Sequence, residues 1–142
     1  MTNIIERIRE TYAALNKDTV ESDLLANLYA DNVVFIDPLH RIETLPNLQV
    51  YFKNMYQNVS HINFNFTHTL GDDQSAFLAW DMTFVHPKLN GGNAIVVPGT
   101  SRVQFANGKI THHQDYFDST AMLFGHIPLL KQIINLIKNR LN

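Results

Sequence analysis

The sequence contains no cysteine, which excludes disulfide bonds and thiolate zinc sites and leaves the redox compartment open. It also lacks a basic block, and its net charge of −2 gives no reason to expect nucleic acid as a partner. No apolar run approaches membrane-spanning length, and the charges of Glu6, Arg7, Arg9 and Glu10 interrupt any signal-peptide core in the first 16 residues. We therefore expect neither a nucleic-acid nor a membrane partner, and a cytoplasmic location.

The composition is that of one ordinary globular domain. The chain has 142 residues, of which 45% are hydrophobic and 17% are charged. A domain of this size buries roughly two-thirds of the surface that its unfolded chain exposes. We find no repeat, linker or low-complexity tract, so the prediction is a single domain over residues 1–142.

The first half of the chain has helical periodicity. Asn3 and Glu6 form a capping-box pattern before the first apolar stripe, and Ser22 can cap a second helix. Pro46 is tolerated in the first turn of a third helix. The predicted helices cover about residues 4–15, 22–29 and 44–57, with a short strand at 33–37 that ends at Pro38.

The second half alternates as β-strands do. The predicted strands are 62–70, 75–85, 94–105 and 109–117, and Asn107-Gly108 is a strong hairpin signal between the last two. Pro98-Gly99 predicts a bulge or bend in the third of these strands. Helices followed by antiparallel strands indicate an α+β domain, with a curved sheet wrapped around the N-terminal helices and a cone-shaped cavity between them.

The last strand carries the first candidate for chemistry. Successive strand residues point to opposite faces, so His113, Asp115 and Phe117 share one face. If Phe117 marks the covered face, Asp115 is a carboxylate in an apolar interior, which must be paired, protonated or functional. The structural alternative is an acid that accepts hydrogen bonds from His68, Tyr12 or the backbone.

His68 is the imidazole that we expect in the cavity. It lies between Phe66 and Leu70 in a clean alternation, which predicts the covered face. There it is either a satisfied core histidine or a proton shuttle. The remaining histidines are scattered and show no metal-ligand spacing, so we predict no metal.

Two motifs resemble a known superfamily. Phe35-Ile-Asp37-Pro38 and the ending Gly108-Lys-Ile-Thr-x-x-x-Asp115-Tyr-Phe-Asp118 are similar to the nuclear transport factor 2-like superfamily. The nearer relatives are the SnoaL-type polyketide cyclases, limonene-epoxide hydrolase and ketosteroid isomerase. The resemblance covers essentially the whole chain and implies the cone-shaped fold of a SnoaL-like domain, here with an extra C-terminal helix.

The resemblance assigns roles by position. Asp37 matches the proton-shuttling base of the isomerases, but their oxyanion-hole positions hold Thr11 and Ser101. Asp115 matches an essential acid of the epoxide hydrolase, whose arginine and second aspartate fall on Trp80 and Met82. Neither activity transfers intact, and Asp115 fits the SnoaL-type cyclases best.

The resulting hypothesis is a small cofactor-free enzyme that uses interior carboxylates for isomerisation, cyclisation or hydration of a hydrophobic small molecule. The alternative is a non-catalytic binding or protein-interaction module of the same fold. The expected catalytic residues are Asp115, Asp37 and His68, and the expected substrate-binding residues are Tyr12, Phe35, Phe52, Trp80, Met82, Ser101 and His113.

Two surfaces complete the predictions. The family implies a homodimer through the outer face of the sheet, where Asn65, Thr67, Asp81 and Thr83 would meet a second copy. The predicted terminal helix at 127–141 carries Lys131, Lys138 and Arg140 opposite an apolar stripe. A membrane-surface helix is one interpretation, and a cover for the cavity mouth or a dimer contact is the preferred one.

Overall fold

The computed structural model describes residues 3–141. The first and third predicted helices lie close to their predicted ranges, whereas the second is shorter than predicted, and its N-cap is Asp23 and not Ser22. The Asn3 side chain caps the first helix by accepting a hydrogen bond from the Ile5 amide at 2.9 Å, as the capping pattern predicts. The helices are α1 (Ile4–Ala14), α2 (Leu24–Leu28), α3 (Leu45–Asn58), α4 (Ser119–Met122) and α5 (Pro128–Leu141), with single 3₁₀ turns at Asn90–Gly92 (η1) and Phe124–His126 (η2).

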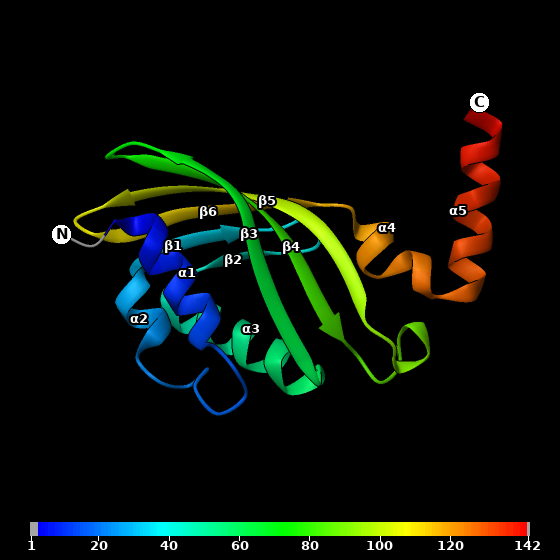
Figure 1. Cartoon of the computed structure of the whole chain (residues 1–142), viewed down its shortest axis with the longest axis horizontal. Coiled ribbons are helices and arrows are strands. Elements are labelled where there is room, and N and C mark those ends of the chain that lie inside the picture. Colours follow the sequence, from blue (N-terminus) through cyan, green and yellow to red (C-terminus); the bar gives the residue numbers. More distant parts are fainter. Residues whose placement is uncertain (1–2, 142) are drawn as a thin grey trace.

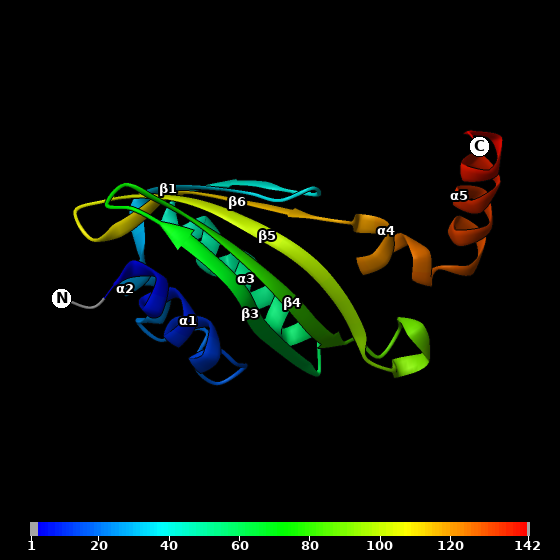
Figure 2. The same cartoon turned by 45° about the horizontal axis from the view of Figure 1, so that its top comes forward.

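One curved sheet forms the other layer. Its strands are β1 (Tyr29–Ile36), β2 (Arg41–Glu43), β3 (His61–Gly71), β4 (Ser75–Val85), β5 (Ile95–Ala106) and β6 (Lys109–Phe117), in the order β2-β1-β6-β5-β4-β3. The α-helices α1, α2 and α3 lie on the concave side of this sheet (Figures 1 and 2). The predicted α+β architecture is thus present, although β2 and α4 are too short to give a periodic signal.

The sheet is mixed and not purely antiparallel. β1 pairs in parallel with β6, with Phe35 opposite His113 and Ile36 opposite Gln114. The sequence could not show this pairing because it joins segments about 80 residues apart. This pairing brings the two carboxylates together, because Asp37 directly follows β1 and lies next to the part of β6 that carries Asp115.

The alternation of β3 is interrupted by a bulge. The register with β4 shifts between Phe66 and His68, so Phe66 faces the helices while His68 is exposed. A one-residue shift exchanges the two faces of a strand, which explains why Leu70 is also on the outside. Of the bulge or bend predicted at Pro98-Gly99, the bulge is absent, because β4 and β5 pair through these residues without a shift.

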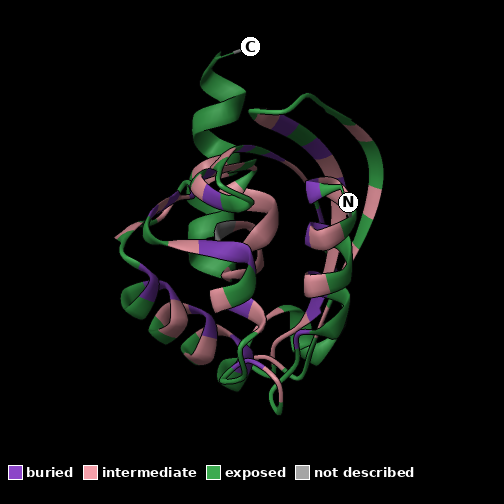
Figure 3. Cartoon of the chain, turned by 90° about the vertical axis from the view of Figure 1, so that its left-hand side faces the viewer, coloured by how far each residue is buried: buried purple, intermediate pink, exposed green. Residues whose placement is uncertain are grey.

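The core lies between α1–α3 and the sheet. Tyr29, Phe52 and Leu25 are its largest fully buried side chains. The last helix, α5, behaves differently: none of its residues is buried, and it projects from the end of the domain (Figures 1 and 3). No described helix is long and apolar enough to cross a membrane.

Candidate functional site

A cavity of about 500 Å³ opens between the concave face of the sheet and α1, α3 and α4. Its walls are mostly apolar, and its polar atoms come from few residues. Seven of the predicted site residues line it, namely Tyr12, Phe35, Asp37, Phe52, Trp80, Met82 and Asp115. The predicted cone-shaped cavity therefore exists and contains both carboxylates.

Asp115 is held from two sides by buried neighbours. The Ser101 hydroxyl donates to its Oδ1 at 2.5 Å, and Nε2 of His113 lies 2.7 Å from the same oxygen. Ser101 is placed by strand register, because it stands opposite Asp115 on β5. Both hydrogen bonds end on Oδ1, which leaves Oδ2 as the oxygen for a ligand in the cavity.

A chain of hydroxyl groups continues behind His113. Its Nδ1 lies 2.9 Å from the Tyr29 hydroxyl, which is 2.7 Å from the Tyr12 hydroxyl. An ionised Asp115 only accepts hydrogen bonds, so Nε2 of a neutral His113 carries the proton and Nδ1 accepts from Tyr29. Every donor in the chain then points toward Asp115, an arrangement that stabilises its negative charge.

Trp80 is fixed on the other side of the same acid. Its Nε1 donates to the Ser101 oxygen at 2.9 Å, so the indole reaches Asp115 through Ser101. The indole lies directly over Gly99, its partner on β5, and a Cβ added at Gly99 would overlap three ring atoms. The absence of a side chain at Gly99 therefore provides the space that the Trp80 indole ring occupies.

Asp37 is bound more completely than Asp115. Its Oδ1 accepts from the amides of Leu39 and His40 at 2.7 Å and lies 3.2 Å from Nδ1 of His40. Its Oδ2 accepts from the Tyr51 hydroxyl at 2.8 Å. The carboxylate thus caps the turn after β1, the structural role expected of an aspartate before proline, while still lining the cavity.

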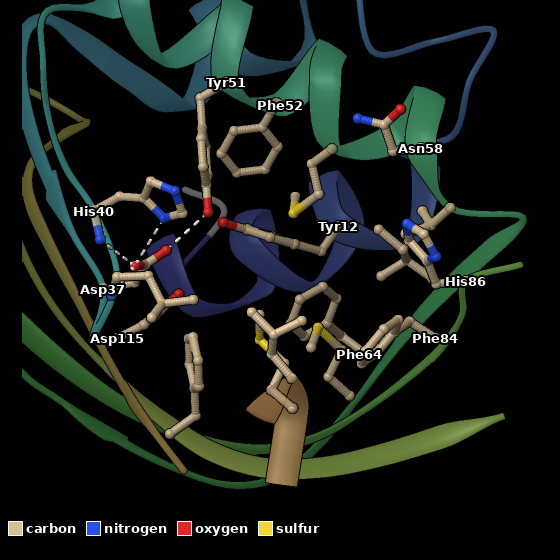
Figure 4. A pocket seen from close by; sticks show the side chains of 18 of the residues that line it. Tyr12, Asp37, His40, Tyr51, Phe52, Asn58, Phe64, Phe84, His86 and Asp115 are labelled. Atoms are coloured by element: carbon tan, nitrogen blue, oxygen red, sulfur yellow. Dashed lines mark hydrogen bonds and ion pairs between the residues drawn. The ribbon is translucent and has the colours of Figure 1, made fainter. Parts of the chain in front are cut away.

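The two carboxylates and two hydroxyl groups gather on one side of the cavity, whereas the polar side chains of Asn58 and His86 lie on the other side (Figure 4). Figure 4 shows Asp37, Asp115 and the hydroxyl groups of Tyr12 and Tyr51 on the first side, with Phe64 and Phe84 on the other side. Burial raises the pKa of both tyrosines well above the ordinary value of 10.0, and the charge of Asp115 adds to the effect. Both therefore remain protonated hydrogen-bond donors near neutral pH.

The predicted role of His68 is contradicted by its position. The bulge in β3 turns its side chain outward, so it lines no part of the cavity and contacts Thr67 instead. His113 is the imidazole at the site: it is 3% exposed and bonded directly to Asp115. The sequence placed His113 on the correct face but did not identify its partner.

Three further residues were missed by sequence reasoning. Tyr29 falls at the end of the helix predicted at 22–29, whereas it begins β1 and bonds to His113. Tyr51 falls within the helix predicted at 44–57, but neither its hydroxyl nor His40 was predicted to belong to the site. The available signal was a tyrosine on an apolar face, since a buried hydroxyl needs a hydrogen-bond partner.

The described residues contain no group of three histidine, aspartate or glutamate side chains that could hold a metal ion. The polar groups of the cavity are carboxylates, phenols, an indole nitrogen, imidazoles and the amide of Asn58. Such groups can accept or donate a proton at a bound organic molecule.

Comparison with solved structures gives consistent folds at low sequence identity. A protein from Catenulispora acidiphila with a ketosteroid isomerase-like fold, solved with trimethylamine, superposes with a TM-score of 0.73 and 11% identity over 89% of this chain and 92% of that one. An LEH-like epoxide hydrolase from M. tuberculosis gives 0.71 and 16%, over 93% and 96%. A candidate SnoaL-like polyketide cyclase from Shewanella denitrificans gives 0.70 and 16%, over 84% and 93%.

These likenesses show the fold and leave the chemistry open, because one fold supports many activities. No curated protein matches the sequence significantly. The family model of the SnoaL-like domain matches residues 8–113, which is most of the chain and ends just before Asp115. The predicted fold class and resemblance are thereby confirmed, and the chain belongs to the SnoaL-like domain family.

Proposed function

We propose that this protein is a cofactor-free enzyme that performs acid–base chemistry on an apolar small molecule, with Asp115 as the general base. The observation that carries the proposal is the position of Asp115. Its carboxylate is fixed through one oxygen by His113 and Ser101, and it lines a mostly apolar cavity. A positioned base in such a site typically contributes a factor of about 10² to 10⁴ in rate.

The donors around the cavity complement that base. When Asp115 removes a proton from a carbon next to a carbonyl, negative charge develops on the carbonyl oxygen, which then needs a hydrogen-bond donor. The Tyr12 and Tyr51 hydroxyls line the same cavity and keep their protons. In this structure these protons are donated to Tyr29 and Asp37, so each hydroxyl serves a bound ligand only by turning away from that partner. The same acid can instead take a proton from water that attacks an epoxide or an alkene conjugated to a carbonyl.

Asp37 supports the site and is not the leading candidate for the base. Four donors surround its two oxygens, so proton abstraction by Asp37 would disrupt the turn that it caps. We assign it to holding Tyr51 beside the cavity. This assignment differs from the role that the isomerase resemblance implies.

The test uses proton exchange, which requires the base but no particular product. Wild-type protein and Asp115→Asn are incubated with a panel of apolar ketones in D₂O, and loss of α-proton signals is followed by NMR. A parallel panel of apolar epoxides is followed for diol formation. We expect activity in one panel and a decrease of at least about 100-fold in Asp115→Asn.

The second candidate is a binding module without catalysis. It is favoured by the complete hydrogen bonding of Asp37 and by the absence of lysine and arginine from the described cavity lining. If neither panel reacts while the neutral dye Nile red binds wild-type and Asp115→Asn equally, the binding module is correct. Mass spectrometry of molecules that co-purify with the protein would then identify the ligand.

A further inference from the structure

Helix α5 leaves a continuous apolar surface uncovered. None of its residues is buried, and Leu129, Leu136 and Ile137 are 68%, 55% and 53% exposed. The helix also contributes no residue to the cavity lining, so it does not cover the cavity mouth as the sequence suggested. A contiguous exposed apolar patch on one helix typically marks an interaction site for a protein, a membrane or a ligand.

The apolar residues of α5 form one stripe. At 100° per residue they fall within an arc of about 160°, which leaves the rest of the circumference polar. Arg140, in the last turn, also falls inside this arc and not opposite it as the sequence predicted. The stripe consists of Leu129, Leu130, Ile133, Ile134, Leu136, Ile137 and Leu141. Lys131 and Lys138 are seven residues apart, and therefore lie on one side of the helix beyond the edge of the stripe.

The charge of this segment has a single sign. All 13 acidic residues of the chain precede Ser119, whereas Lys131, Lys138 and Arg140 lie in α5. An exposed helix with one apolar face and only basic charges matches the surface of an anionic bilayer, where the apolar face enters the boundary of the acyl chains and the cations meet phosphate groups.

A second copy of the chain fits the stripe less well. Two α5 helices packed against each other would bring their lysines together without any acidic residue of α5 to compensate. The outer face of the sheet offers one exposed apolar pair, Leu70 opposite Phe77, and Arg102 stands on the other side of Phe77. Neither surface complements a long apolar stripe with positive flanks.

We propose that α5 docks the protein on anionic lipid surfaces by inserting this stripe into the interface. This replaces the expectation of no membrane partner, which rested on the absence of a spanning segment. Met122 and Leu123, which line the cavity, lie shortly before α5 in the chain, so this part of the cavity wall is close in sequence to the docking helix. Passage of an apolar ligand between bilayer and cavity is a consequence that rests on the proposed function.

The test is flotation of the full-length protein with vesicles. One set contains phosphatidylcholine alone, and in the other phosphatidylglycerol replaces part of it. We expect binding to the anionic vesicles that decreases as salt is added. Ile137→Glu should weaken binding at least about tenfold, and Lys138→Gln about fivefold.

The matched control is Leu70→Glu, which changes an exposed leucine on β3 and should bind like the wild type. Thermal unfolding of all variants checks that they are folded, and no turnover is measured, so this proposal can fail while the proposed function stands. Failure to bind either kind of vesicle overturns the proposal. Equal binding to both kinds overturns the claim that α5 recognises an anionic surface. Dissociation of a stable oligomer by Ile137→Glu, seen by sedimentation, overturns it by assigning α5 to an interface between copies.

Discussion

His113 Nε2 lies 2.7 Å from Oδ1 of Asp115, and the two residues are separated by one position on strand β6. Their side chains share the concave face because strand residues two apart point the same way. The pair is therefore built into the sheet, and its geometry does not depend on a loop. A base oriented in this way by a buried imidazole should be sensitive to changes in either partner.

We expect His113→Asn to reduce proton exchange strongly, since the shorter side chain cannot bridge Tyr29 and Asp115. Burying an unsatisfied hydroxyl should also lower the free energy of unfolding by about 1–3 kcal/mol. The matched control is His68→Asn, which alters an exposed histidine on β3 and should change neither quantity measurably. NMR exchange rates and urea unfolding measure the two effects. Equal behaviour of the two variants would contradict the assignment of His113.

Ser101→Ala should remove a donor to Asp115 and leave Nε1 of the buried Trp80 without an acceptor. The unsatisfied indole N–H should cost about 1–3 kcal/mol in urea unfolding. In the double variant with Trp80→Phe both partners are absent, so its cost should be less than the sum of the two single costs. Strict additivity would show that Trp80 and Ser101 do not interact.

Gly99→Ala should displace the Trp80 indole, because the new methyl group would occupy ring positions. Overpacking of this kind typically costs about 1–3 kcal/mol. Val96→Ala, at an exposed position on the same strand, serves as the control and should stay within about 0.5 kcal/mol of the wild type. Trp80 is the only tryptophan, so its fluorescence reports the displacement directly. An unchanged emission spectrum in Gly99→Ala would refute the contact.

Asp37→Asn should affect stability more than chemistry. The asparagine side chain has one oxygen that can still accept hydrogen bonds, either from the amides of Leu39 and His40 or from Tyr51. It has lost the negative charge that strengthens these bonds in the wild type. Bonds to a charged acceptor are worth about 1.5–3 kcal/mol each, and we expect a loss at the lower end of that range. Proton exchange should fall less than in Asp115→Asn. The reverse order of activities would make Asp37 the base.

The protein should lose stability steeply above pH 10. Burial raises the pKa of Tyr12, Tyr29, Tyr51 and Tyr56 above the ordinary value of 10.0. The unfolded chain therefore releases these protons first, and a folded state that binds more protons loses stability as pH rises. Urea unfolding between pH 8 and about pH 11 measures the slope, and phenolate absorbance should rise together with unfolding. Tyr56→Phe, which removes one of these groups, should reduce the slope.

The sequence predicted the architecture well where local patterns control it. The stripes of α1 and α3, the Asn107-Gly108 turn and the alternation of β6 gave elements close to those found. They also placed Asp115 on the covered face. These are properties of neighbouring residues, which helix and strand periods determine.

What could not be predicted depends on contacts between distant segments or on irregular backbone. The bulge near Thr67 moved His68 outward, although the residues around it alternate perfectly. The link from Tyr12 through Tyr29 to His113 joins three elements, and the sequence shows only three aromatic side chains on apolar faces. Trp80 and Gly99 likewise become partners only through strand register.

The parallel pairing of β1 with β6 has a consequence for how the protein folds. Strands β3 to β6 can assemble through successive turns, but β1 meets β6 only when a loop of about 80 residues closes. Such closure is slow because the chain loses conformational entropy before the new contacts form. Until that closure occurs, Phe35 and Asp37 are absent from the cavity wall, and Tyr29 is not in place behind His113. During refolding, sheet formation should therefore precede the ability to retain a ligand, and binding competence should appear in the slowest phase.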